Sequence, residues 1–344
     1  MNLSLLKLPR QQGNYLYYRL LELDGAVSRA SRLGDDRLAG EAVQSLDQLL
    51  LQDRGYIRER PSAGFSAVVR TCHSVDVDSW DLLTETLQGY YAFAHFLLSK
   101  AHIQLGQFES AVRHATRANE LGAPNAEVYY DLGFASYQLM QYEEAAANYE
   151  KAIRLSPQDP RYYSALGGAL TGLGKHKEAI TVLRKSIGLG PGNSDAHNTL
   201  SYAFIQIGDY KAAIDSADEA IKIDSGCAFA HNNRGRANMK LGRFSEAVKD
   251  LETAVRLEPR LLQSWSHLGR AYQAEGNMQK AGDCYNGVLV IMRQIKIRSK
   301  DQYLAAVSAE RGLNEIGITT KNHFEMEALS KGILTKKVIA FYLT

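Results

Sequence analysis

The chain has 344 residues, of which 45% are hydrophobic and 23% are charged, as in an ordinary globular protein. Its 40 Lys and Arg residues nearly balance 38 Asp and Glu residues, and a net charge of +2 lacks the basic excess of a nucleic-acid-binding domain. Cys72, Cys227 and Cys284 are far apart, which argues against a disulfide framework or a thiolate zinc site and favours a reducing, cytoplasmic compartment. No apolar run predicts a membrane span, and the first residues lack the pattern of a secretory signal.

The first 91 residues have helical patterns but no clear repeat. Residues 15–33 and 36–52 predict a helical hairpin, with a degenerate repeat left open as an interpretation. Residues 53–78 combine glycine, proline and alternating apolar residues, which predicts an irregular loop with room for a short strand. This N-terminal region (1–91) is therefore expected to be mostly helical.

A short element recurs from residue 106 onward at a fixed spacing of 34 residues. It reads GQFESA, MQYEEA, GKHKEA, GDYKAA, GRFSEA and GNMQKA. The spacing defines six units, which are 92–125, 126–159, 160–193, 194–227, 228–261 and 262–295.

Within a unit, position 8 is always small and position 20 is always alanine, as two closely crossing helices require. Apolar residues recur at three- and four-residue spacing in both halves, so each unit is predicted to be helix, turn, helix. Proline follows the second helix in three units, where it stops the helix. Four residues depart from the pattern: Met140 replaces the turn glycine, Arg234 replaces the leucine of the other units, Pro124 comes one place late, and Ser225 replaces a proline.

This pattern over residues 92–295 resembles the tetratricopeptide repeat (TPR) family. The resemblance implies an all-α fold, a right-handed α-solenoid (superhelix) of stacked helix-turn-helix units. Residues 296–317 carry an apolar stripe that predicts a C-terminal capping helix, because terminal repeats must cover their apolar face. The tail, 318–344, is weakly patterned and is expected to be mobile or loosely docked.

The glycine-rich stretch GGALTGLGKH (167–176) superficially resembles a phosphate-binding loop. Ala169 stands where the GxxxxGK[ST] motif needs glycine, and His176 stands where it needs a hydroxyl group. The repeat explains two of the four glycines, but Gly168 and Gly172 are surplus and each costs a helix about 1 kcal/mol. We therefore predict no nucleotide site. Instead, Gly168 is expected to leave a surface without side chains, where a ligand backbone approaches closely, or to form a flexible joint between the aromatic and basic halves of the groove.

Catalytic and metal sites are not expected. His95, His197 and His231 share the repeat position of Trp265, which predicts packing groups rather than metal ligands. No HExxH or GxSxG motif occurs, and nothing in the sequence combines a nucleophile with a base. The sequence predicts no enzyme, no cofactor and no metal.

The resemblance implies that the first helices line a concave groove that binds peptides. Its first third is aromatic, its middle is bare, and its last third carries amide and guanidinium donors. The candidate peptide-binding residues are Phe93, Phe96, Lys100, Tyr130, Phe134, Tyr137, Gly168, Asn198, Tyr202, Asn232, Asn233, Arg236 and Arg270. An acidic or carboxylate group of a ligand would meet the amide and Arg donors of the last third.

The favoured hypothesis is a noncatalytic scaffold or adaptor that binds peptide or protein segments in this groove, compatible with a place in a larger complex. One alternative is a regulatory or assembly subunit whose groove is partly filled by its own N-terminal segment. Another is an enzyme with an unrecognised site. The lysines of a chaperone-tail clamp are missing, and the near-neutral charge disfavours an RNA-binding solenoid.

Overall fold

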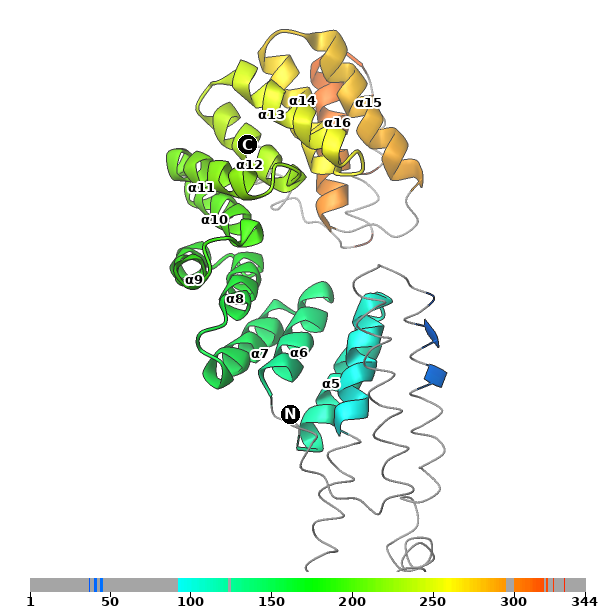
Figure 1. Ribbon diagram of the computed structural model, residues 1–344. Helices are drawn as coiled ribbons and strands as arrows, with labels where there is room; N and C mark the ends of the chain where they lie inside the picture. The colour runs from blue at the N-terminus through cyan, green and yellow to red at the C-terminus, as the bar shows by residue number, and fades with distance from the viewer. Residues whose placement is uncertain are drawn as a thin grey trace, which may run out of the picture. The chain divides into compact units, whose positions relative to one another are not determined.

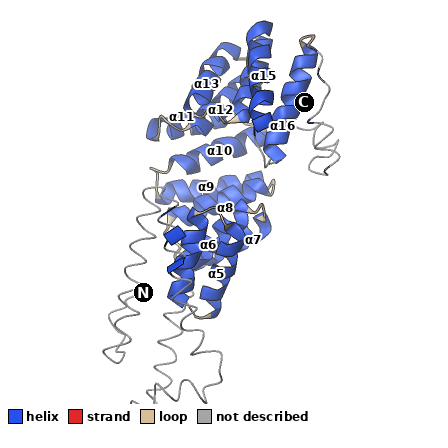
Figure 2. Cartoon of the chain, turned by 90° about the vertical axis from the view of Figure 1, so that its right-hand side faces the viewer, coloured by secondary structure: helices blue, strands red, loops and turns tan. Residues whose placement is uncertain are grey.

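The computed structural model describes residues 92–122, 125–294 and 300–318, and a few single residues outside them. The hairpin and loop predicted for residues 1–91, and most of the tail, lie outside the described residues. Within the described part, helices alternate with short turns and no strand occurs (Figures 1 and 2). The predicted all-α fold is therefore confirmed.

The chain divides into two compact units at Leu173–Gly174, inside the third predicted repeat. Unit 1 contains the helical residues 92–104 followed by α5 (Phe108–Glu120), α6 (Ala126–Gln138), α7 (Tyr142–Leu155) and α8 (Pro160–Gly172). Unit 2 contains α9 (His176–Leu189), α10 (Ser194–Ile207), α11 (Tyr210–Ile223), α12 (Ala228–Lys240), α13 (Phe244–Leu257), α14 (Leu262–Ala274), α15 (Met278–Gln294) and α16 (Lys300–Glu315).

Each unit is a stack of helix pairs. Every helix packs on the next one in its unit, and the first helices of successive pairs also touch: α6 with α8, α10 with α12, α12 with α14, and α14 with α16 (Figure 1). Second helices such as α11 and α13 make no comparable contact with each other among the described helices. The first helices therefore form the inner layer, and their outward-facing side chains form a continuous surface that we call the first-helix face of each unit.

The two helices of a pair cross closely because one side chain is missing at the crossing point. A Cβ atom built on Gly133, Gly235 or Gly269 would lie 2.6, 2.7 or 2.4 Å from the side chain at position 24 of the same repeat. The alanines of position 20 are fully buried at the same crossings. In the fourth repeat the small residue is Ser201, whose hydroxyl donates to the carbonyl oxygen of Ala213 at 2.8 Å. The expected columns of small residues thus have a steric cause.

The turn within each pair needs a left-handed residue. The turn glycines have φ between 66° and 83°, and Met140 adopts the same conformation with φ of 59°. This conformation lets the next residue donate a backbone hydrogen bond five residues back, as Gln141 does to Ser136 at 2.9 Å and Asp209 does to Phe204 at 3.0 Å. Met140 therefore carries strain that glycine avoids.

In four repeats the large residue at position 4 holds the preceding turn. Its side chain donates to the backbone carbonyl six residues earlier, which follows the second helix of the previous pair. These bonds are Tyr163 to Pro157 at 3.0 Å, His197 to Pro191 at 3.3 Å, His231 to Ser225 at 3.3 Å and Trp265 to Pro259 at 2.9 Å. His197 and His231 are thus structural donors that satisfy carbonyls left open at helix ends.

Helix α16 closes the last pair by packing on α14 and α15. Tyr303, Val307 and Leu313 are buried in one core with Tyr285 of α15. The carboxylate of Glu310 accepts the backbone N–H of Phe324 at 3.0 Å, and the Phe324 ring is buried. Phe324, which belongs to the tail, therefore packs against α16.

The stretch 167–176 is the end of α8 and the turn after it. A Cβ atom on Gly172 would lie 2.8 Å from the ring of Tyr142, so this glycine makes room for the ring. A Cβ atom on Gly168 would meet only Tyr137 at 3.8 Å, an ordinary contact distance. Gly172 therefore has a packing reason within unit 1, whereas Gly168 leaves space.

Replacing Met140 by glycine is expected to stabilise unit 1 by about 1 kcal/mol, because the left-handed strain disappears. Little packing is lost, since the Met140 side chain is more than half exposed. The midpoint of urea unfolding, followed by circular dichroism, measures the change. Gly208→Met is the reverse control and should lower stability by a similar amount; stabilisation by both changes would contradict the strain argument.

Gly168→Ala is expected to raise the melting temperature, because alanine favours a helix by about 1 kcal/mol and meets no clash here. Gly172→Ala, four residues further along the same helix, should give no gain or a loss, because its Cβ would collide with Tyr142. Differential scanning calorimetry compares the two variants. An equal gain for both would show that Tyr142 moves aside freely.

Candidate functional site

Three cations lie on the first-helix face of unit 2. Arg236 and Lys240 are one turn apart on α12, and Arg270 occupies on α14 the repeat position of Arg236. The Arg236 guanidinium lies over the ring of Tyr202 on α10, 5.5 Å from its centroid. We call Arg236, Lys240 and Arg270 the basic face; the sequence analysis predicted both arginines but not Lys240.

The three cations act on one another and on His267. Burial, Arg270 and Arg236 all lower the pKa of Lys240. Burial lowers the pKa of His267 well below its ordinary value, and the three cations lower it further. The imidazole is therefore neutral at pH 7, and its Nδ1 donates to the side-chain oxygen of Asn232 at 3.0 Å. Among the described residues, every charge that shifts these two pKa values is positive, so this surface favours an anion.

The predicted asparagine donors lie beside the basic face but join helices. Asn232 is buried and its side-chain oxygen also accepts the Ser264 hydroxyl at 3.1 Å. Buried Asn233 donates to the side-chain oxygen of Asn198 at 2.9 Å. These bonds link α10 to α12 and α12 to α14, so ligand binding by the amides stays a prediction. Phe229, at the start of α12, is 54% exposed and supplies an apolar contact on the same helix.

The predicted aromatic residues of unit 1 pack against other rings. The centroids of Phe93 and Phe96 are 6.4 Å apart, and the Lys100 ammonium lies 4.7 Å above the Phe96 ring. Tyr130 lies 5.4 Å from Tyr162. Phe134 meets Phe108 at 6.4 Å, and Tyr137 meets Tyr142 at 5.4 Å. The five predicted rings are only partly buried, so the first-helix face of unit 1 is lined with aromatic surface.

Two carboxylates at the edge of this aromatic surface are paired with Arg161, whereas a third, that of Asp131, is not. Arg161 bonds Glu127 at 2.6 Å and Asp159 at 2.7 Å, and the Tyr162 hydroxyl donates to Glu127 at 2.9 Å. Asp131, which the sequence analysis missed, is 6% exposed, and its Oδ2 has no hydrogen-bond partner. Burial raises the pKa of Asp131 to about 7.

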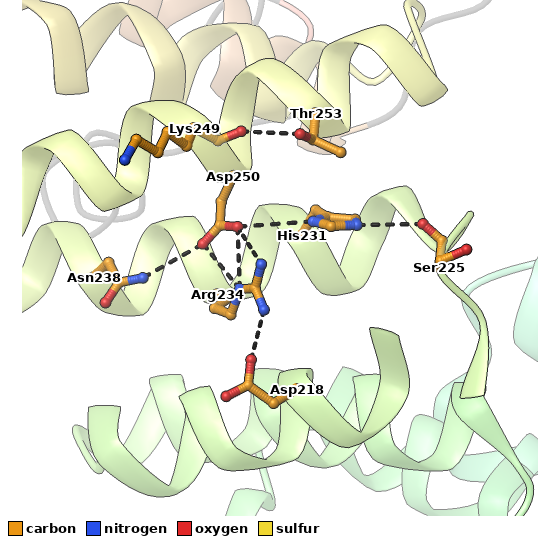
Figure 3. Close-up of polar contacts among 8 residues, drawn as sticks. All are labelled: Asp218, Ser225, His231, Arg234, Asn238, Lys249, Asp250 and Thr253. Atoms are coloured by element: carbon orange, nitrogen blue, oxygen red, sulfur yellow. Dashed lines mark hydrogen bonds and ion pairs between the residues drawn. The ribbon is translucent and has the colours of Figure 1, made fainter. Parts of the chain in front are cut away.

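The most extensive polar cluster of unit 2 is structural. Arg234 of α12 donates to Asp250 of α13 at 2.6 Å and to Asp218 of α11 at 2.6 Å, and Asn238 donates to Asp250 at 3.4 Å (Figure 3). Burial alone would raise the pKa of Asp250, but the neighbouring His231 and Arg234 hold it below its usual range. Since His231 Nδ1 is 3.8 Å away, too far for a hydrogen bond, we assign most of this effect to Arg234. The cluster joins three helices and contains no nucleophile.

Three histidines, His95, His102 and His114, gather in unit 1, where the sequence predicted His95 to be a packing group. The Nδ1 atoms of His95 and His114 are 2.9 Å apart, and His102 stacks on His114 with centroids 5.1 Å apart. His102 Nδ1 donates to the side chain of Gln107 at 2.8 Å. Within the described ranges, no group of three His, Cys, Asp or Glu residues has the arrangement of a metal site.

Comparisons with known families agree with this architecture. A TPR repeat model matches residues 136–174, and tetratricopeptide repeat models match residues 165–227, 228–261 and 262–289. No curated protein matches the chain.

Several solved structures are similar to this chain at low sequence identity. The crystal structure of the APC/C hetero-tetramer Cut9-Hcn1 is 15% identical with a TM-score of 0.58, over 81% of this chain and 52% of that one. TTC0263, a thermophilic TPR protein of Thermus thermophilus, is 18% identical with a TM-score of 0.46, over 53% and 99%. MamA from Desulfovibrio magneticus RS-1 is 22% identical with a TM-score of 0.43, over 50% and 97%.

The stacked helix pairs define an all-α helical-repeat solenoid. Residues 136–289 of the chain consist of tetratricopeptide repeats. This architecture supports a role as a protein-interaction scaffold, and the number of six repeats stays a prediction. None of the described helices is both long and apolar enough to cross a membrane.

Replacing Arg234 by leucine, the residue of the other repeats, is expected to destabilise unit 2 by about 3 kcal/mol. The change leaves the buried carboxylate of Asp250 without its main partner. Adding Asp250→Ser recreates the Leu200 and Ser216 pair of the preceding repeat, and should recover most of the loss. Urea unfolding at pH 7 measures both variants; a fully stable single variant would show that the ion pair adds nothing.

Proposed function

We propose that this chain is a noncatalytic scaffold that binds an acidic segment of a protein partner on the basic face of unit 2. The observation that carries the proposal is the grouping of Arg236, Lys240 and Arg270, whose positive charges lower the pKa values of Lys240 and His267. A carboxylate placed here would relieve the repulsion among the three cations. Guanidinium groups also bind carboxylates through paired hydrogen bonds.

The surroundings of the basic face suit a peptide. Tyr202 already stacks with Arg236, and the exposed ring of Phe229 supplies an apolar contact one turn before Asn232. Charged hydrogen bonds of this kind contribute about 1.5–3 kcal/mol each, so two or three of them are enough for specific binding. The free thiols of Cys227 and Cys284 are consistent with the proposed reducing, cytoplasmic compartment.

The test uses a fluorescein-labelled, capped octaglutamate peptide and the full chain. The double variant Lys240→Glu/Arg270→Glu is expected to weaken binding at least about tenfold in fluorescence anisotropy, because each lost contact costs about 1.5 kcal/mol. Higher salt should weaken binding to the unchanged protein.

The matched control carries the same change in charge on another surface. Lys211 and Lys222 lie exposed on α11, a second helix, so Lys211→Glu/Lys222→Glu should leave octaglutamate binding within a factor of about two. Circular dichroism checks that both variants stay helical. Equal losses in the two double variants would mean that net charge, not the basic face, drives binding, and would overturn the proposal.

A further inference from the structure

We infer that unit 1 carries a second binding site of opposite charge: the first-helix face around Asp131 takes a lysine or arginine side chain of a protein partner. This site is independent of the basic face, because it lies in the other unit and depends on other residues. Its elements are a buried carboxylate without a hydrogen-bond partner and the aromatic rings beside it.

The first observation is the isolation of Asp131. Its side chain lies on α6, is 6% exposed, and buries an Oδ2 atom that accepts no hydrogen bond. A buried polar group left unsatisfied costs about 1–3 kcal/mol, and folded proteins rarely retain one without a reason. The neighbouring carboxylates, Glu127 and Asp159, are both bonded to Arg161.

The second observation is that the nearby cations are engaged elsewhere. Lys100 and Arg161 lower the pKa of Asp131 from a distance, while Glu127 raises it. Arg161 is shared by Glu127 and Asp159, and the Lys100 ammonium lies over the Phe96 ring. Neither cation is among the hydrogen-bond partners of Asp131, so its carboxylate lacks a direct cation contact among the described residues.

The third observation is that the rings of this unit already hold cations. Besides Lys100 over Phe96, the Arg161 guanidinium lies 5.9 Å from the Tyr130 ring, and the Lys151 ammonium lies 5.4 Å from the Tyr129 ring. Aromatic faces attract Lys and Arg through their quadrupole. A carboxylate beside such rings matches a basic side chain in both its charge and its apolar stem.

Binding at this site is coupled to a proton. Because burial raises the pKa of Asp131 to about 7, its carboxyl gains or loses a proton near neutral pH. A bound cation favours the ionised form, so it lowers this pKa and releases the proton. Affinity therefore rises as the pH rises through 7.

The other groups around Asp131 do not reverse this sign. Lys100 comes from the helix at 92–104, Glu127 from α6 and Arg161 from α8, and α5 adds no charge that shifts the Asp131 pKa. On α7, the pKa of Tyr149 is raised by burial far into the alkaline range. Tyr130 also has a raised pKa, chiefly through burial, so neither phenol ionises near pH 7.

The experiment is isothermal titration calorimetry of the full chain with a capped octalysine peptide. Repeating it at several pH values, in buffers of different ionisation enthalpy, counts the protons released. Affinity should rise about tenfold from pH 6 to pH 8, because the ionised fraction of a group with pKa about 7 rises by that factor. Lysine side chains stay charged throughout this range.

The variant Asp131→Asn should abolish both the proton release and the pH dependence, and should weaken binding at pH 8. It keeps the side-chain shape, and it should raise the melting temperature at pH 8 because it removes a buried charge. The matched control Glu143→Gln removes an exposed carboxylate from α7 and should behave like the unchanged protein.

Three results would overturn the inference: affinity that does not change with pH, the same pH dependence in Asp131→Asn, or equal binding of capped octaglutamine. The Lys240→Glu/Arg270→Glu variant should retain this pH dependence, since its changes lie in unit 2. Failure of this site can therefore be told apart from failure of the basic face.

Discussion

The rest of the structure depends on the close crossing of two helices within each repeat. At Gly133, Gly235 and Gly269 the first helix has no side chain, and the residue at position 24 of the second helix fills that place. This contact sets the distance within each pair and lets the first helices of neighbouring pairs touch. Polar side chains about one repeat apart then come within bonding distance, as in Arg161 with Glu127, Asn233 with Asn198, and His267 with Asn232.

Two buried carboxylates, those of Asp131 and Asp250, show that direct contact with a cation decides whether the pKa of a buried carboxyl is raised or lowered. Asp131 and Asp250 have nearly the same exposure, 6% and 7%. Asp250 is bonded to Arg234 and has a lowered pKa, whereas Asp131 has no such bond and a pKa raised to about 7. Burial opposes the charge in both cases, so the difference lies in whether a cation makes direct contact. We read the first arrangement as structural and the second as a site prepared for a ligand.

Unit 2 groups the three cations of the basic face, whereas unit 1 buries the Asp131 carboxylate without a direct cation contact in the described part of the chain. In the proposed scaffold, the two surfaces would select partner segments of opposite charge. The net charge of +2 alone does not reveal this arrangement, because it is a sum over the whole chain.

The sequence by itself determined the repeat. Its 34-residue spacing, the small residues at position 8, the alanines at position 20 and the turn glycines predicted the helices from Ala126 to Gln294 and the fold they make. These features recur because each repeat solves the same steric problem, so comparing the repeats exposes them. The large residues at position 4 also recur, because side chains such as Tyr163 and Trp265 donate to equivalent backbone carbonyls in their repeats.

Only the tertiary structure decided which polar side chains have hydrogen-bond partners within the described part of the protein and which have none. It showed that Asn232 and Asn233 join helices, that Gly172 makes room for Tyr142, and that Lys240 belongs with the two predicted arginines. It also showed that Asp131 has no hydrogen-bond partner at its buried oxygen. Each of these outcomes depends on side chains from different helices that meet in a single repeat. The repeat pattern cannot predict such a contact, because the residues that form the contact differ from one repeat to the next.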